Sequence, residues 1–230
     1  MTQFSLRLSQ VQERISSACQ QFGRNPEEIT LLAVSKLQPV DAVREAAACG
    51  QRRFGENFVQ EALEKIEATR DLDLEWHFIG HLQSNKTRQV ATDFQWVHSV
   101  DREKIARRLD AQRHHHAAPL NVCIQVSVAK EPGKGGVEEA DLRSLAEVIT
   151  GLPRLRLRGL MTMPPPSDKF DEQRGYFRRL RQLRDELALD GFRLDTLSMG
   201  MTGDLEAAVA EGSTMLRVGT ALFGPRPRTG

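Results

Sequence analysis

The chain has 230 residues and a mass of 25.9 kDa, and its 40% hydrophobic and 27% charged side chains are typical of a folded globular protein. Thirty-two lysines and arginines oppose 31 acidic residues, so the net charge of +1 gives no electrostatic reason for an obligatory nucleic acid or membrane partner. No apolar run approaches the ~20 residues that cross a bilayer. We therefore expect neither kind of partner.

The N-terminal segment predicts an amphipathic helix over about residues 2–22, because its apolar positions alternate with polar ones at helical spacing. It has no signal-peptide core. The cysteines Cys19, Cys49 and Cys123 are far apart and form no CxxC motif. We expect reduced thiols and a cytoplasmic protein.

Short β-type runs then alternate with helical segments along the rest of the chain. The eight runs cover residues 30–36, 53–57, 76–80, 96–100, 121–128, 156–163, 196–201 and 215–223. A helical segment follows each of the first seven, which predicts a (β/α)8 TIM barrel that takes in residues 1–230 as a single α/β domain. An open, doubly wound sheet would give the same alternation. However, no GxGxxG motif follows the first run, as dinucleotide binding would require.

The active site of such a barrel lies at the carboxyl ends of its strands, where the first run ends in Lys36. By strand alternation Lys36 shares a face with Leu32 and Val34, so an amine ends an apolar row. Such an amine loses its proton more readily than a surface lysine and can form a Schiff base with an aldehyde. The alternative is that Lys36 only marks the exit of the strand into water.

The ends of the seventh and eighth runs predict an anion site. Ser198, Gly200 and Thr202 lie where a helix begins, and its unpaired N–H groups would favour an anion. Gly219 would let backbone approach a ligand, and Thr220 adds a hydroxyl. The alternative is that these glycines only turn the chain.

Two further side chains belong to the same end of the barrel. Arg217 shares the inner strand face with Met215 and Gly219, and a buried cation needs an acid or a ligand as its partner. Asn57 could offer its amide to a ligand, but the sequence alone favours a role as cap of the helix that follows it.

Together these residues carry a resemblance that covers almost the whole chain. Six segments, in order, resemble the pyridoxal-phosphate homeostasis proteins, the YggS/PROSC-like family: LLAVSK at 31–36, FGEN at 54–57, WHFIGHLQSNK at 76–86, GLM at 159–161, LSMGM at 197–201 and RVGTALFG at 217–224. Any one segment is a weak signal, and the ordered set is a specific one.

The resemblance implies a fold-type III pyridoxal 5′-phosphate (PLP) protein, similar to the N-terminal barrel domain of alanine racemase. It implies that PLP forms a covalent imine with Lys36 and that Arg217 faces the pyridine nitrogen. The other implied cofactor-binding residues are Ser198, Gly200, Gly219 and Thr220 for the phosphate, Asn57 and His81 for the pocket, and Met199. One departure is Gln38, where many relatives have a second lysine.

The implied function is to hold PLP and to buffer or deliver it in intracellular vitamin B6 homeostasis, with PLP-requiring apoenzymes as recipients. An arginine at the pyridine nitrogen opposes its protonation, so PLP should be a weak electron sink. The only tyrosine, Tyr176, lies in a predicted helix outside the barrel. We expect a monomer with no catalytic residues and no metal site. The alternatives are a weak amino-acid racemase and a PLP-free phosphosugar-binding barrel.

Overall fold

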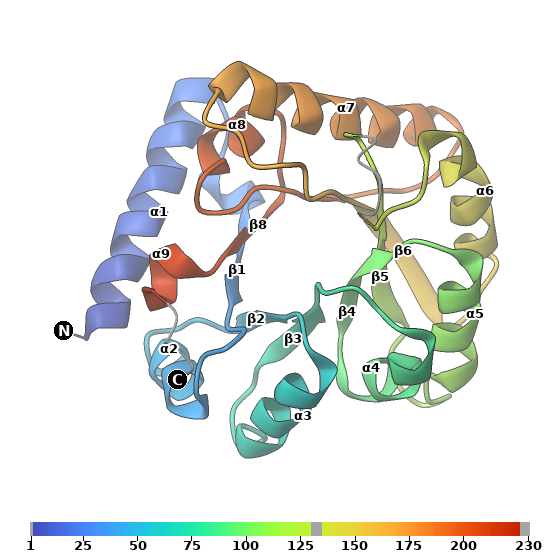
Figure 1. The fold of residues 1–230 in the computed structure, drawn as a ribbon, viewed down its shortest axis with the longest axis horizontal. Helices are drawn as coiled ribbons and strands as arrows, with labels where there is room; N and C mark the ends of the chain where they lie inside the picture. The colour runs from blue at the N-terminus through green and yellow to red at the C-terminus, as the bar shows by residue number, and fades with distance from the viewer. Residues whose placement is uncertain (1, 130–134, 226–230) are drawn as a thin grey trace.

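The structure is a computed structural model that describes residues 2–129 and 135–225; the remaining residues of the predicted domain lie outside the described part. Eight parallel strands close into a barrel in chain order, β1 to β8, and the helices surround it (Figure 1). The predicted (β/α)8 barrel is confirmed, and the open-sheet alternative is wrong.

The strands begin within one residue of their predicted starts. They are β1 (Thr30–Val34), β2 (Arg53–Glu56), β3 (Glu75–Phe78), β4 (Trp96–Val100), β5 (Leu120–Gln125), β6 (Leu155–Met161), β7 (Thr196–Ser198) and β8 (Met215–Val218). The α-helices are α1 (Gln3–Phe22), α2 (Val40–Ala48), α3 (Val59–Ala68), α4 (Thr87–Asp93), α5 (Glu103–Gln112), α6 (Glu139–Thr150), α7 (Phe170–Leu189), α8 (Leu205–Ala210) and α9 (Thr220–Phe223). Two 3-10 turns, η1 (Pro26–Glu28) and η2 (Ser84–Lys86), precede β1 and α4.

Strand alternation divides the buried side chains into two layers. The inner layer includes seven buried hydrophobic residues: Leu32, Val34, Ile79, Trp96, Cys123, Met161 and Met215. The larger outer layer packs the other face of the strands against the helices. The barrel closes where β1 pairs with β8, and there Leu32 lies beside Arg217. Arg217 therefore points into the barrel beside an apolar side chain, at the pairing of β1 with β8 that closes the barrel.

Helix α1 covers the closing seam of the barrel. One face of the helix is buried through Phe4, Leu8, Val11 and Ile15, as its amphipathic pattern predicts. The helix packs beside α8 and α9, which follow β7 and β8 (Figure 1). Among the helices of the described part, none combines the length and the apolar character that a membrane span needs.

Two of the predicted element boundaries that are wrong lie at the cavity described below. The eighth strand does not continue to residue 223, because its last pair with β1 is Ala33 with Val218 and the chain then turns into α9. The helix after β7 does not begin at Thr202, where the sequence predicts its start. That helix begins at Leu205, and the Asp204 carboxylate accepts a hydrogen bond from the amide of Met201 at 2.5 Å, which closes a turn ahead of it.

Candidate functional site

A cavity of about 210 Å³ opens at the carboxyl ends of the strands, between β1, β2, β8 and the loop after β7. Six of the residues predicted from the sequence line it: Lys36, Asn57, Thr202, Arg217, Gly219 and Thr220. The other four are not among its lining residues: His81, Ser198, Met199 and Gly200. Val34, Ile79 and Met163 supply apolar wall. The cavity therefore combines an amine, a guanidinium, an amide and a hydroxyl with an apolar surround.

Lys36 lies two residues beyond β1, in a turn at the cavity wall, and its side chain is half-buried. The next residue, Leu37, has a φ of 62°, the left-handed region that a leucine rarely adopts. A conformation of this kind persists only where its surroundings hold it, and it is found most often at functional sites.

A buried ion cluster holds the backbone on both sides of Lys36. We name it the Lys65 cluster; it consists of Lys65, Glu56 and Glu61. The ammonium of Lys65 donates to Glu56 Oε1 at 2.7 Å, to Glu61 Oε1 at 2.6 Å and to the carbonyl oxygen of Ser35 at 2.6 Å. Glu61 Oε1 accepts from the amide of Leu37 at 2.5 Å. The residues before and after Lys36 are therefore both bonded to this cluster.

Glu56 is the most deeply buried member of the Lys65 cluster, with no exposed surface. Its Oε1 also accepts from the Ser35 hydroxyl at 2.7 Å, whereas Oε2 has no hydrogen-bond partner among the described residues. Burial raises the pKa of this carboxyl, and the charge of Lys65 opposes that rise. The cluster thus keeps a charged pair in the layer between the barrel and α3.

Asn57 lies one residue beyond β2, and its side chain does not cap α3, so the capping expectation is wrong. The N-cap of α3 is Phe58, and no side-chain cap bond is present. Asn57 Oδ1 is buried without a hydrogen-bond partner in the described part of the chain. The backbone of Asn57 also approaches Gly80 so closely that a β-carbon at Gly80 would lie 2.1 Å from the Asn57 carbonyl oxygen. An orphaned acceptor in a cavity wall is suited to a ligand donor.

Arg217 is only 3% exposed, and it lies on the inner face of β8. One terminal nitrogen donates to Ser198 Oγ and the other to the carbonyl oxygen of Thr162, both at 2.8 Å. Within residues 2–129 and 135–225, no carboxylate forms an ion pair with this guanidinium. Burial lowers the pKa of Arg217 to about 10. The cavity therefore has a fixed, desolvated cation in its wall.

The four predicted residues outside the cavity lining have other surroundings. Ser198 is fully buried and bonds to His98 as well as to Arg217. Met199 faces outward into the outer core. Gly200 has a φ of 97° and packs so tightly that an added β-carbon would lie 2.5 Å from the β-carbon of Ala208. His81 is exposed beyond the end of β3.

Comparisons with known proteins identify the family of this chain. The sequence pattern described as "Alanine racemase, N-terminal domain" matches residues 6–227. The pyridoxal phosphate homeostasis protein of Pseudomonas aeruginosa is 54% identical over 226 residues, which cover 98% of this chain and 97% of that protein. The protein of the same name from Escherichia coli K12 is 50% identical over 234 residues, with 98% of each chain covered. This chain belongs to the pyridoxal phosphate homeostasis protein family.

Solved structures extend the family likeness to the fold. PipY of Synechococcus elongatus PCC7942, in a structure with PLP bound, is 40% identical, with a TM-score of 0.86 over 96% of this chain and 100% of its own. Alanine racemase from Corynebacterium glutamicum is 18% identical, with a TM-score of 0.66 over 97% of this chain and 62% of its own. The second likeness concerns the fold alone.

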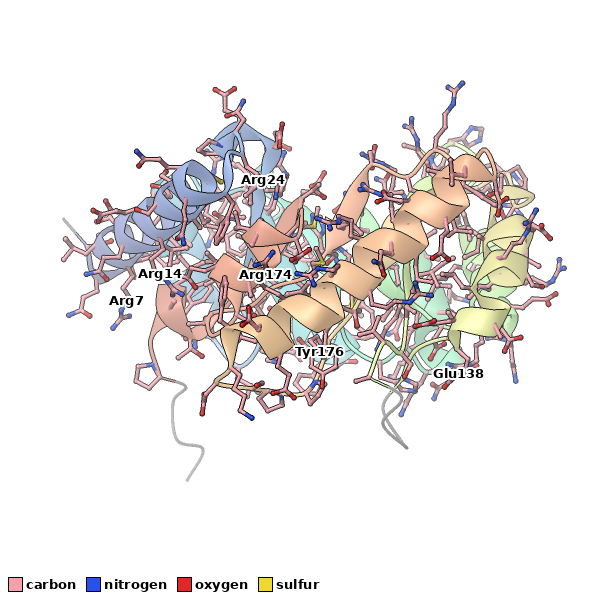
Figure 2. All side chains as sticks on the ribbon, turned by 90° about the horizontal axis from the view of Figure 1, so that it is seen from above. Arg7, Arg14, Arg24, Glu138, Arg174 and Tyr176 are labelled. Atoms are coloured by element: carbon pink, nitrogen blue, oxygen red, sulfur yellow. The ribbon has the colours of Figure 1, made fainter. Side chains whose placement is uncertain are left out.

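Several residues at the cavity or supporting it were not predicted from the sequence. The loop after β7 lines the cavity with Met201 and Gly203, on either side of the predicted Thr202. Arg14 of α1 holds this loop, because it donates to the Thr202 carbonyl oxygen at 3.0 Å and to both carboxylate oxygens of Glu206 at 2.8 and 2.9 Å. In Figure 2 Arg14 lies on the side of α1 that faces α8. Nothing in its local sequence distinguishes it from other exposed helical arginines, so only the tertiary packing reveals its role.

Proposed function

We propose that this protein binds PLP in the cavity at the carboxyl end of the barrel and buffers or delivers it within the cytoplasm. The observation that carries the proposal is that one small cavity brings together the amine of Lys36 and the buried guanidinium of Arg217. The family supplies the ligand class, since its members are named for pyridoxal phosphate homeostasis and PipY has been solved with PLP bound.

The residues of the cavity fit PLP group by group. PLP supplies an aldehyde, and its condensation with the Lys36 amine forms a C=N bond and releases one water. Arg217 is the donor for the pyridine nitrogen, and the orphaned Asn57 Oδ1 is an acceptor for a ligand hydroxyl. Gly219 and Thr220 provide backbone and a hydroxyl at the end where we place the phosphate.

Two features support storage rather than turnover. An arginine donor at the pyridine nitrogen keeps that nitrogen unprotonated, which weakens carbanion stabilisation. Racemisation also needs an acid or base on each face of the substrate carbon. Among the described lining residues only Lys36 could serve, and Tyr176 lies on α7 outside the barrel (Figure 2). We propose a monomeric carrier that supplies PLP-requiring apoenzymes.

Borohydride reduction followed by peptide mapping tests the proposal. The protein should acquire an absorbance band on addition of PLP, and the reduced phosphopyridoxyl group should map to Lys36. Lys36→Ala should lose both signals, whereas Lys104→Arg, which changes an exposed lysine of α5, should keep both. A label on another lysine would refute the assignment.

A weak amino-acid racemase is the second candidate, because the family barrel is shared with alanine racemase. Incubation of the PLP-loaded protein with a single amino-acid enantiomer in deuterated water separates the two. The carrier proposal predicts α-proton exchange no faster than PLP alone produces, and exchange at enzymic rates would overturn it.

A further inference from the structure

A row of hydrogen bonds crosses the interior of the barrel from the cavity to its opposite mouth. Arg217 bonds to Ser198 Oγ at 2.8 Å, and Ser198 Oγ bonds to His98 Nδ1 at 2.8 Å. His98 Nε2 bonds to His77 Nδ1 at 2.9 Å, and His77 Nε2 bonds to Glu75 Oε1 at 2.9 Å. We name these five residues the interior network. It links strands β8, β7, β4 and β3 in turn.

The interior network is buried everywhere except at its far end. Ser198, His98 and His77 have no exposed surface, whereas the side chain of Glu75 is 37% exposed and lines a polar recess at the amino-terminal mouth of the barrel. Burial lowers the pKa of both histidines, and the charge of Arg217 lowers that of His98 further. The neutral side chains of Ser198, His98 and His77 therefore separate the buried Arg217 cation from the Glu75 carboxylate.

The two ends fix the direction of every hydrogen bond between them. A guanidinium has only donors, so Ser198 Oγ accepts from Arg217. A carboxylate has only acceptors, so His77 donates from Nε2; the hydrogen bond from His77 lowers the pKa of Glu75 and keeps it ionised. It follows that His77 Nδ1 accepts from His98 Nε2, and that His98 Nδ1 accepts the Ser198 hydroxyl proton. The reverse order would set a lone pair of His77 against the Glu75 carboxylate.

We propose that Glu75, His77, His98 and Ser198 are positioning residues for Arg217. Every side chain of the row has its acceptor atom on the side that faces the guanidinium, and the row ends on the negative charge of Glu75. This arrangement stabilises the Arg217 cation, which has no ion-pair partner in the described chain. The Ser198 and Thr162 acceptors anchor both terminal nitrogens, so the plane of the guanidinium is fixed in the cavity wall. Ser198 thus acts below the cavity, through Arg217.

The consequence for PLP rests on the proposed function. A guanidinium held by the interior network presents its remaining donors to the pyridine nitrogen in one orientation. Without Ser198, one N–H of Arg217 loses its acceptor, and the guanidinium is released to reorient. Without His98, the Ser198 hydroxyl proton loses its acceptor, so the hydroxyl is no longer held in the orientation that accepts from Arg217. The loss of one charge-assisted hydrogen bond corresponds to weaker ligand binding on the order of tenfold.

The first experiment needs no PLP. Nitrogen-15 NMR of the histidine side chains in the ligand-free protein should show His77 and His98 both neutral and both protonated at Nε2. Ser198→Ala should leave the fold intact by circular dichroism but speed solvent exchange of the Arg217 side-chain protons severalfold. Protonation of either histidine at Nδ1 in the wild-type protein would overturn the proposal, even if a variant failed to fold.

The second experiment measures PLP binding by absorbance titration. His98→Leu and Ser198→Ala should each weaken binding about tenfold and shift the absorbance band of bound PLP. His98→Gln, whose amide can accept from Ser198 and donate to His77, should recover most of both losses. Cys123→Ala, a control in the same inner layer, should change neither. Equal PLP affinity and an unshifted absorbance band in all variants would overturn the positioning proposal. If the wild-type protein itself does not bind PLP, the proposed function is wrong, and the NMR experiment still tests the positioning proposal.

Discussion

The two cations of the cavity are supported in opposite ways. The Lys65 cluster bonds to the backbone on either side of Lys36, and it does so with full charges in the layer between the barrel and α3. The interior network bonds to the Arg217 guanidinium itself, and it does so with neutral groups inside the barrel. In this protein a cluster of charged side chains holds the turn at Lys36, whereas polar side chains without net charge hold the Arg217 guanidinium inside the barrel.

The largest effect should come from removal of the cation in the Lys65 cluster. Lys65→Met leaves Glu56 buried with neither carboxylate oxygen facing an ammonium, and breaking a buried pair costs about 3–5 kcal/mol of unfolding free energy. Urea unfolding measures this loss. Lys104→Met, at an exposed position, should stay within about 0.5 kcal/mol of wild type.

The double variant Glu56→Leu, Lys65→Met sharpens that test. Replacement of both partners by apolar side chains removes the stranded charge, so this variant should be more stable than Lys65→Met alone. A Lys65→Met protein as stable as the Lys104→Met control would show that the cluster does not hold the turn at Lys36.

The backbone that supports Arg217 should be the next most sensitive. The carbonyl oxygen of Gly200 accepts from the amide of Arg217 at 2.9 Å. Gly200→Ala adds a β-carbon 2.5 Å from Ala208 at a φ of 97°, so we expect a loss of about 2–4 kcal/mol in thermal or urea unfolding. At Gly203 an added β-carbon meets nothing within 4 Å. Gly203→Ala should therefore be near neutral, and similar losses in both variants would contradict the packing argument.

The interior network should make stability depend on pH. His77 and His98 have pKa values below the 6.5 of an unfolded histidine, because both are buried; the charged groups that face them are Glu75 and Arg217. The unfolded chain therefore binds protons first as the pH falls. The stabilisation is complete above about pH 6.5 and declines below it by up to about 1.4 kcal/mol per pH unit for each histidine.

Urea unfolding between about pH 7.5 and pH 5.5 checks this prediction. In His98→Gln the free energy of unfolding should decline about half as steeply with falling pH as in the wild-type protein. Glu56, whose raised pKa favours the folded state at low pH, contributes equally to both proteins, so its contribution cancels in the comparison. An equal slope in the two proteins would show that His98 is not held neutral.

The smallest effect should come from the turn beside Lys36. Leu37 has a φ of 62° and an exposed side chain, and asparagine tolerates this backbone conformation better than leucine. Leu37→Asn should therefore gain about 0.5–1 kcal/mol of unfolding free energy. Leu37→Val, which is β-branched, should lose stability, and a shift of both variants in the same direction would contradict the assigned strain.

Much of the fold follows from local sequence patterns. Apolar runs at strand spacing alternate with amphipathic helices, and the position of Lys36 at the end of an inner row follows from alternation with Leu32 and Val34. The predicted eighth strand is five residues longer than the observed one, because the sequence of residues 219–223 is compatible with either a strand or a helix. Its end depends on the pairing with β1, which the local sequence does not contain.

The supports of the site were harder to predict than its lining. His77 and His98 occupy inner positions of neighbouring strands, but no spacing rule links residues on separate strands until the barrel register is known. The Lys65 cluster could have been predicted in part from the sequence. Glu56 and Lys65 each place a charge on the apolar face of their strand or helix, and a buried charge needs a partner of opposite sign. For Ser198, the residue type suggested a ligand contact, whereas the register of β7 directs its hydroxyl to Arg217.

The central claim is that PLP lies between Lys36 and Arg217. A crystal structure of the protein grown with PLP tests it most directly. The claim predicts electron density continuous from Lys36 Nζ to the ligand, with the pyridine nitrogen facing the Arg217 guanidinium and the phosphate beside Gly219 and Thr220. An empty cavity in crystals that contain PLP elsewhere, or a ligand turned with its phosphate against Arg217, would contradict it.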